Sequence, residues 1–150
     1  MTMHQPIPEP TRDVLAVIEH WHRYMRGETP DALDELLDDD AVMVSPVVFT
    51  PQRGKAIVTR YLEAARRTFA AGGFDVPGGF RYTRQIASGD TAVLEFETTM
   101  GGKYVNGVDI IQVRSGRITE FRVMIRPLQA VQTVHELMGA QLTAGHEPPR

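Results

Sequence analysis

The 150-residue chain contains no cysteine, which excludes disulfide bonds, thiolate metal sites and cysteine nucleophiles. It also lacks any apolar run approaching about 18 residues, so we predict no membrane-spanning segment and no membrane partner. The first ten residues have neither a basic opening nor an apolar stretch. We therefore expect no signal peptide and a cytoplasmic location.

Clustered basic charge is missing as well. Sixteen Lys and Arg stand against 19 Asp and Glu, which gives a formal net charge of -3. The nearest approach to a basic stripe is Arg60, Arg66 and Arg67, which lie among helix-forming residues and fit an exposed helix face. A nucleic-acid partner is therefore not expected.

Metal-ligand spacings are absent too. His20 and His22 are two residues apart on a predicted helix, so they face different directions and cannot share a metal. The run Asp38-Asp39-Asp40 points in divergent directions and is expected at a solvated helix end. We predict neither a metal nor an organic cofactor.

What remains is a chain with 42% hydrophobic residues, whose length favours one domain with its own core. Residues 1–10 hold three prolines and no periodicity, so we expect a disordered lead-in. A single domain is expected over 11–140 and a frayed tail over 141–150.

Hydrophobic spacing predicts four helices. Thr11 is the expected N-cap of a helix that ends near Gly27, and Thr29-Pro30-Asp31 opens a second helix with its leucines inside. A third helix starts at Gly54, with Ile57, Tyr61, Ala65 and Phe69 along one stripe, and a fourth starts at Pro127.

Strands are predicted at 41–44, 80–87, 91–100, 104–114 and 117–126. The last four are joined by short turns, which is typical of an antiparallel meander. Helices followed by such a sheet indicate the α+β class. Both faces of 104–114 are largely apolar, so we expect helices on one face and a second copy of the chain on the other, as a homodimer through the sheet.

This order of elements resembles the nuclear transport factor 2-like superfamily, in particular its SnoaL-like members. The resemblance rests on the stretch 105–113 (VNGVDIIQV), on GRITEF at 116–121, on DDDAVMVSPV at 38–47 and on GKAI at 54–57. It implies a cone in which a curved antiparallel sheet wraps around the N-terminal helices and encloses an apolar pocket. The superfamily contains isomerases, cyclases, hydrolases, dehydratases and binding modules, so the fold alone does not define an activity.

Asp109 is the main candidate for chemistry, because strand alternation places it on the same face as Val105, Ile111 and Val113. A carboxyl among apolar side chains must find hydrogen bonds or stay protonated. The resemblance implies the same, since Asp109 falls where ketosteroid isomerases carry the acid that hydrogen-bonds the oxyanion; that enzyme is a standard example of a neutral carboxylic acid. The alternative is a structural ion pair with Arg122 or Arg126.

The remaining candidates follow from the same resemblance. The isomerase base before Pro-Val is replaced by Ser45, and the oxyanion tyrosine would fall near His20, one helical turn from Tyr24. We therefore expect Asp109 as acid, assisted by His20 or Tyr24, and no ketosteroid isomerase activity of the usual kind. The expected ligand-binding residues are Trp21, Ser45, Tyr61, Phe121, Val123 and Arg126.

Two functional hypotheses remain open at this stage. The first is a cofactor-independent isomerase, lyase or hydrolase that acts on a small hydrophobic carbonyl, alcohol or epoxide compound. The second is a non-catalytic ligand-binding or dimeric interaction module of the same fold.

Overall fold

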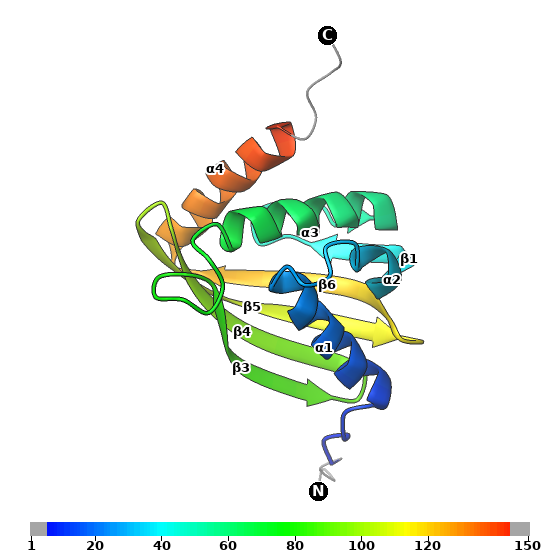
Figure 1. The fold of residues 1–150 in the computed structure, drawn as a ribbon. Coiled ribbons are helices and arrows are strands. Elements are labelled where there is room, and N and C mark those ends of the chain that lie inside the picture. Colours follow the sequence, from blue (N-terminus) through cyan, green and yellow to red (C-terminus); the bar gives the residue numbers. More distant parts are fainter. Residues whose placement is uncertain (1–5, 145–150) are drawn as a thin grey trace, which may run out of the picture.

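The computed structural model describes residues 6–144, which form four helices and one six-stranded curved sheet (Figure 1). In chain order the elements are α1 (Arg12–Met25), α2 (Leu33–Leu36), β1 (Leu37–Val44), β2 (Gln52–Arg53), α3 (Lys55–Phe69), β3 (Arg81–Ser88), β4 (Thr91–Met100), β5 (Lys103–Arg114), β6 (Arg117–Arg126) and α4 (Leu128–Ala144). Helices α1 and α3 lie over one face of the sheet, and α4 runs beside α3. The α+β class is confirmed.

Helix α1 begins as its sequence predicts. The side chain of Thr11 accepts a hydrogen bond from the backbone N–H of Val14 at 3.1 Å, which satisfies one of the free donors of the first turn. The Thr11 hydroxyl also donates to Asp90 at 2.7 Å, in the turn between β3 and β4. This cap therefore ties the start of the helix to the far edge of the sheet.

The sheet has the strand order β2-β1-β6-β5-β4-β3. Strands β3 to β6 form the predicted antiparallel meander, but β1 pairs with β6 in parallel, so the sheet is mixed and not wholly antiparallel. A short apolar strand carries no sign of its distant neighbour in its own sequence. The parallel pairing therefore could not be predicted from residues 41–44.

The region between α1 and β1 differs from the prediction. Helix α2 is a single turn, because strand β1 starts at Leu37, which is fully buried. Asp38, Asp39 and Asp40 lie in β1, so their predicted placement at a helix end is wrong. The side chain of Asp38 accepts a hydrogen bond from the N–H of Asp40 at 2.9 Å, at an irregularity in the pairing with β6.

Regular contacts extend past both ends of the domain expected over 11–140. The carbonyl of Pro8 accepts a hydrogen bond from Ser88, and Glu9 and Thr11 bond to the backbone of Gly89. These residues are held in place, so the disorder expected over 1–10 does not apply to 8–10. Helix α4 continues to Ala144, beyond the expected limit at 140. Residues 1–5 and 145–150 lie outside the described residues.

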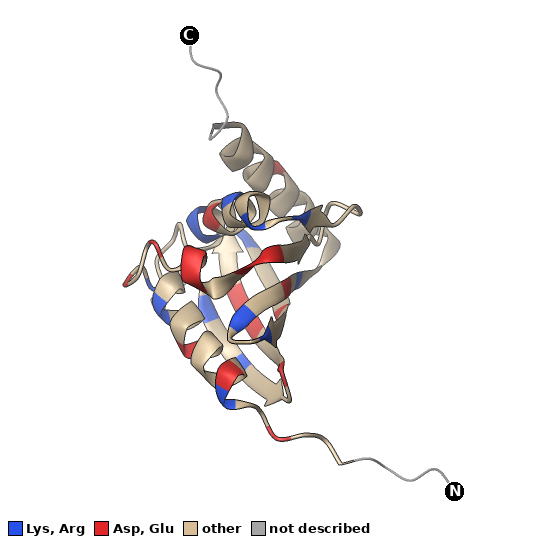
Figure 2. Cartoon of the chain, turned by 90° about the vertical axis from the view of Figure 1, so that its right-hand side faces the viewer, with Lys and Arg blue, Asp and Glu red and all other residues tan. Residues whose placement is uncertain are grey.

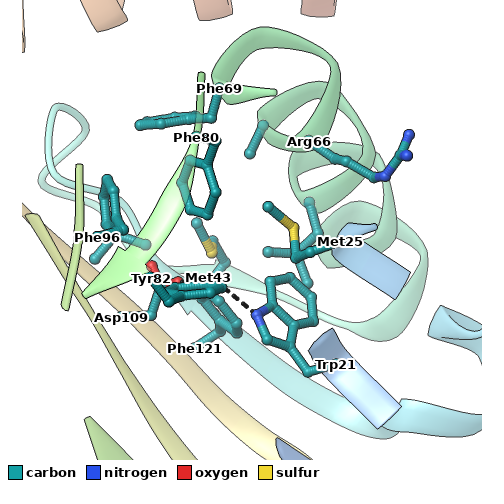
Figure 3. Close-up of a pocket in the computed structure, with 13 residues that line it drawn as sticks. Trp21, Met25, Met43, Arg66, Phe69, Phe80, Tyr82, Phe96, Asp109 and Phe121 are labelled. Atoms are coloured by element: carbon teal, nitrogen blue, oxygen red, sulfur yellow. Dashed lines mark hydrogen bonds between the residues drawn. The ribbon is translucent and has the colours of Figure 1, made fainter. Parts of the chain in front are cut away.

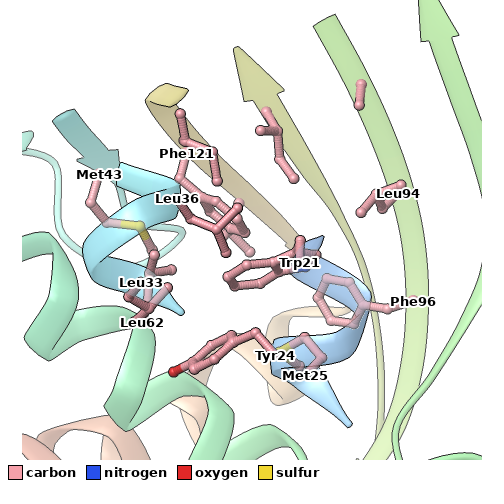
Figure 4. Packing of buried hydrophobic residues seen from close by; sticks show 14 of the residues in the cluster. Trp21, Tyr24, Met25, Leu33, Leu36, Met43, Leu62, Leu94, Phe96 and Phe121 are labelled. Atoms are coloured by element: carbon pink, nitrogen blue, oxygen red, sulfur yellow. The ribbon is translucent and has the colours of Figure 1, made fainter. Parts of the chain in front are cut away.

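The core fills the space between the helices and the concave face of the sheet (Figure 4). Its largest fully buried side chains include Phe96, Phe121, Ile18, Leu36, Leu62 and Leu94. Gly107 on β5 is required there, because a Cβ atom would lie 2.5 Å from both the ring of Phe96 and the carbonyl oxygen of Met124. The absent side chain lets the Phe96 ring fold over β5.

Charges of both signs are distributed over the surface (Figure 2). Acidic side chains gather around α2 and the start of β1, and Lys55 pairs with Asp34 at 3.1 Å. Within residues 6–144, no helix is both long and apolar enough to cross a membrane. In that same part of the chain, no three His, Asp or Glu side chains are grouped so that they could hold a metal ion.

Candidate functional site

An apolar chamber lies between α1, α3 and the concave face of the sheet (Figure 3). We call it the inner chamber. It is lined by Trp21, Met25, Met43, Leu62, Ala65, Arg66, Phe69, Phe80, Tyr82, Phe96, Asp109, Phe121 and Val123. The cavity volume is about 40 Å³, which is room for a few water molecules.

Asp109 is the carboxyl group of this chamber. It lies on β5 opposite Leu94 and Val123, and it is 6% exposed, as strand alternation predicts. Burial raises the pKa of Asp109 from 3.8 to about 7, and a hydrogen bond from Tyr82 partly opposes that rise. The group is therefore close to half-protonated at neutral pH.

Tyr82 connects Asp109 to helix α1. Its hydroxyl lies 2.6 Å from Oδ2 of Asp109 and 2.8 Å from Nε1 of Trp21. Burial, and then the charge of Asp109, raise the pKa of Tyr82 well above its ordinary value, so the hydroxyl stays protonated. Tyr82 was not among the predicted site residues, although the alternation of Phe80 and Tyr82 at the start of β3 indicates that both rings share one face of the strand.

The direction of this hydrogen-bond chain is fixed by chemistry. An indole N–H can only donate, so Trp21 donates to the oxygen of Tyr82, and the hydrogen of Tyr82 goes to Oδ2 of Asp109. Within the described residues, Oδ2 of Asp109 bonds Tyr82 and no partner is found for Oδ1. With Tyr82 donating to Oδ2, the proton of the neutral acid belongs on Oδ1, the carboxyl oxygen that is free to bond a ligand.

The structural ion pair considered for Asp109 is absent from residues 6–144. Arg122 instead lies 3.4 Å from Glu120, and its side chain is 42% exposed. Arg126 is exposed, with its guanidinium 3.5 Å from the side-chain oxygen of Asn106, so it does not line the inner chamber. Both arginines lie on the side of β6 that faces away from the chamber.

The predicted assistants on α1 are not brought to Asp109. His20 is half-buried and does not line the chamber. Tyr24 is buried beside Trp21, with ring centroids 5.3 Å apart, and burial followed by the charge of Glu63 raises its pKa to about 12. It does not line the chamber either. The partner of Asp109 comes from β3 instead.

Trp21, Phe121 and Val123 do line the inner chamber. The rings of Trp21 and Phe121 pack at 4.8 Å between centroids, which fixes the indole so that its N–H reaches Tyr82. On the opposite wall, Phe69, Phe80 and Phe96 form an aromatic cluster, and the rings of Phe80 and Phe96 pack against the ring of Tyr82. The chamber is therefore rigid and apolar apart from its one carboxyl, one phenol and the Arg66 side chain.

Ser45 and Tyr61 line a second cavity, which we call the outer chamber. It lies between α3, α4 and the segment after β1, has a volume of about 160 Å³, and is lined by Met43, Ser45, Pro46, Val47, Val48, Tyr61, Ala65, Phe69, Val123, Val134, His135, Met138, Gly139 and Leu142. The oxygen of Ser45 accepts the N–H groups of Val47 and Val48 at 3.1 and 3.3 Å. Ser45 thus shapes this loop and does not face Asp109.

Comparison with known proteins agrees with this architecture. The SnoaL-like domain model matches residues 14–121, and the chain belongs to that family. A crystal structure described as a steroid delta-isomerase from Pseudomonas aeruginosa is 32% identical, with a TM-score of 0.82 over 92% of this chain and 97% of that one. The comparison with curated proteins gives no match.

More distant structures share the fold alone. An uncharacterised protein with a cystatin-like fold from Silicibacter pomeroyi DSS-3 is 24% identical, with a TM-score of 0.72 over 89% of this chain and 87% of that one. An NTF2-like protein of unknown function from Mesorhizobium loti is 20% identical, with a TM-score of 0.66 over 85% of this chain and 100% of that one. The resemblance to the NTF2-like superfamily is confirmed.

Proposed function

We propose that the protein is an enzyme that binds a small, mostly hydrophobic molecule through one oxygen atom and transfers a proton at that atom. Asp109 is the proposed acid, and the oxygen belongs to a carbonyl, alcohol or epoxide. The observation that carries the proposal is the chain from Trp21 through Tyr82 to Asp109, which leaves Oδ1 as the free carboxyl oxygen in an apolar chamber.

The proposed step uses these atoms directly. The Oδ1–H bond of neutral Asp109 donates to the ligand oxygen. When the C–O bond of an epoxide or alcohol breaks, or when solvent water removes a proton from the carbon next to a carbonyl, the Asp109 proton moves to that oxygen and neutralises the charge that would develop there. The carboxylate that remains keeps the hydrogen bond from Tyr82 on Oδ2. A group with a pKa of about 7 can give this proton and take it back at neutral pH, which suits general acid and base work.

Steroid isomerisation is the reaction named for the similar Pseudomonas aeruginosa structure. Two observations argue against carrying it over to this chain. Ser45, at the position of the family's base, cannot accept a proton near neutral pH without a base of its own. The inner chamber, at about 40 Å³, is also small for a rigid four-ring molecule. We therefore favour a smaller or more slender ligand.

A second candidate is a ligand-binding module without turnover. It is favoured by the scarcity of titratable groups, since only Asp109, Tyr82 and Arg66 among the residues that line the inner chamber can carry charge. Arg66 donates to the carbonyl of Tyr24 at 3.0 Å, and the hydroxyl of Tyr82 is bonded to Asp109. A reaction that needs a separate acid and base would lack its second group.

The test uses 2-butanone labelled with carbon-13 at the carbonyl, because a short unbranched ketone suits the small inner chamber. Donation from neutral Asp109 should move the carbonyl resonance of the bound ketone downfield at pH 5, and this shift should fade through about pH 7. The Asp109→Asn variant should keep a shift at every pH, because its amide also donates. The proposed site would be refuted if the carbonyl resonance did not move on binding, or if it moved in the same way with pH in the natural protein and in the Asp109→Asn variant.

Turnover separates the two candidates. In deuterated water, an enzyme that moves protons should exchange the hydrogens next to the carbonyl of 2-butanone, and Asp109→Asn should abolish that exchange. A carbonyl shift without exchange of this or any related ketone supports the binding module.

The cytoplasmic location expected from the sequence stays a prediction.

We also propose that two copies pair through the outer face of the sheet. The described helices lie over the other face (Figure 1), and the outward side chains of Val108, Ile110 and Met124 have none of them as a cover. Met124 is 50% exposed and Ile86, on β3, is 54% exposed. A second copy would remove this apolar surface from water.

A further inference from the structure

The inner and outer chambers share part of their walls. Met43, Ala65, Phe69 and Val123 line both, so the two cavities are direct neighbours. The outer chamber, at about 160 Å³, is about four times as large as the inner one. A molecule whose oxygen lies at Asp109 can therefore extend past these residues toward α4 if it is longer than the inner chamber.

The outer chamber is built from apolar side chains. Helix α4 contributes Val134, Met138 and Leu142, and the segment after β1 contributes Pro46, Val47 and Val48. Its polar members are few. The oxygen of Ser45 is occupied by two backbone N–H groups, His135 is exposed at the rim, and the ring of Tyr61 packs against the core. Such a lining favours an aliphatic group.

The boundary between the chambers restricts the shape of that group. The ring of Phe69 and the side chain of Met43 come from opposite sides, α3 and β1, and both are almost fully buried. A flexible methionine can move aside for a narrow chain more easily than the surrounding rings can for a fused ring system. A slender, unbranched chain fits this passage best.

We propose that the outer chamber binds the apolar tail of a medium-chain aliphatic molecule that carries its carbonyl or hydroxyl oxygen near one end. This inference rests on the proposed function, because the head of that molecule is held at Asp109. The substrate class is thus a straight-chain ketone, aldehyde or alcohol. The length of the bound chain is set by the outer chamber, between α3 and α4.

Gly139 on α4 offers a way to close this chamber. It lines the cavity but is itself exposed, so it lies at the rim, and an added Cβ would meet nothing within 4 Å. Gly139→Leu should narrow the outer chamber at its rim, and it removes a helix glycine, which favours folding. Gly139→Ala makes the same backbone change without filling the space. Ala140→Leu adds the same side chain at the neighbouring exposed position, outside the cavity lining.

The experiment measures calorimetric affinity for the straight-chain methyl ketones from 2-butanone to 2-decanone. Three proteins should behave alike: the natural protein, the Gly139→Ala variant and the Ala140→Leu variant. In each of them, every methylene group added to the ketone should tighten binding about fourfold until the chamber is full. In Gly139→Leu, 2-butanone should bind as before, while the longest ketones should lose about tenfold or more in affinity.

Three results would overturn the inference: no gain with chain length, a gain that Gly139→Leu leaves intact, or an equal loss for 2-butanone and 2-decanone in that variant. Alkenes in which a methylene group replaces the ketone oxygen separate this inference from the proposed function. If they bind as tightly as the ketones, the role of Asp109 fails, while the dependence on chain length still decides whether the outer chamber holds the tail.

Discussion

Replacing Asp109 by Asn should stabilise the protein above neutral pH and leave its stability unchanged in acid. An asparagine can copy the neutral acid closely, because its side-chain oxygen can accept the hydrogen bond of Tyr82 and its amide can take the place of the Oδ1–H group. The variant therefore differs from the natural protein only where Asp109 would carry charge.

The size and sign of the effect follow from the pKa of Asp109. Because burial raises it from 3.8 to about 7, the folded state binds the proton more tightly than the unfolded state does. The free energy of unfolding of the natural protein should therefore fall as the pH rises from about 4 to about 7, and the loss is complete above that window. At about 1.4 kcal/mol per pKa unit, the loss amounts to about 4 kcal/mol.

The assay is chemical denaturation of both proteins from pH 4 to pH 9. Near pH 4 the two should agree within about 1 kcal/mol, since one neutral hydrogen-bonding group replaces another. At pH 8 the variant should be more stable by up to about 4 kcal/mol. A variant that is less stable at pH 8 would mean that the carboxylate has an ionic partner, and a difference independent of pH would mean that Asp109 does not titrate between the two states.

Further predictions concern other parts of the structure. Trp21→Phe should raise the pKa of Asp109, measured by carboxyl NMR, because Tyr82 loses the donor that polarises it and becomes free to accept. Gly107→Ala should lower the free energy of unfolding by about 1–3 kcal/mol, since its Cβ would meet the Phe96 ring and a backbone carbonyl. Light scattering should give twice the monomer mass of 16.7 kDa at micromolar concentration, and Ile110→Glu should shift it toward the monomer by burying an unpaired charge. Treatment with EDTA should leave the melting temperature unchanged.

Much of the fold could be predicted because its signals are local. The strands β4 and β6 have the predicted bounds, since Gly-containing turns flank β4 and precede β6, and Pro127 follows β6. Strand alternation placed Asp109 inside, and the same alternation placed Phe121 and Val123 there. Each of these conclusions needs only neighbouring residues.

Predictions failed where distant partners decide the structure. Leu33, Leu36 and Leu37 have helical spacing, yet the chain turns into a strand at Leu37 because β6 offers a pairing partner there, with Leu37 opposite Ile118. The stripe predicted for α3 was shifted in a similar way. Val58 and Leu62 face the core, whereas Ile57 and Tyr61 are partly buried. Helical periodicity alone cannot identify which of two adjacent stripes faces a sheet and which faces another helix.

The partner of Asp109 was missed for the same reason. Tyr82 lies on β3 and Asp109 on β5, with β4 between them, so the contact depends on how far a tyrosine reaches across an intervening strand. That reach is set by Phe96, opposite Tyr82 on β4, and by Gly107, which leaves room for the Phe96 ring. The chemistry of the acid thus depends on a glycine and two aromatic residues from three strands. The sequence of one strand is enough to predict that a polar side chain faces an apolar cavity. Predicting which oxygen of that side chain carries the proton requires its hydrogen-bond partner, and this partner depends on the packing of several strands.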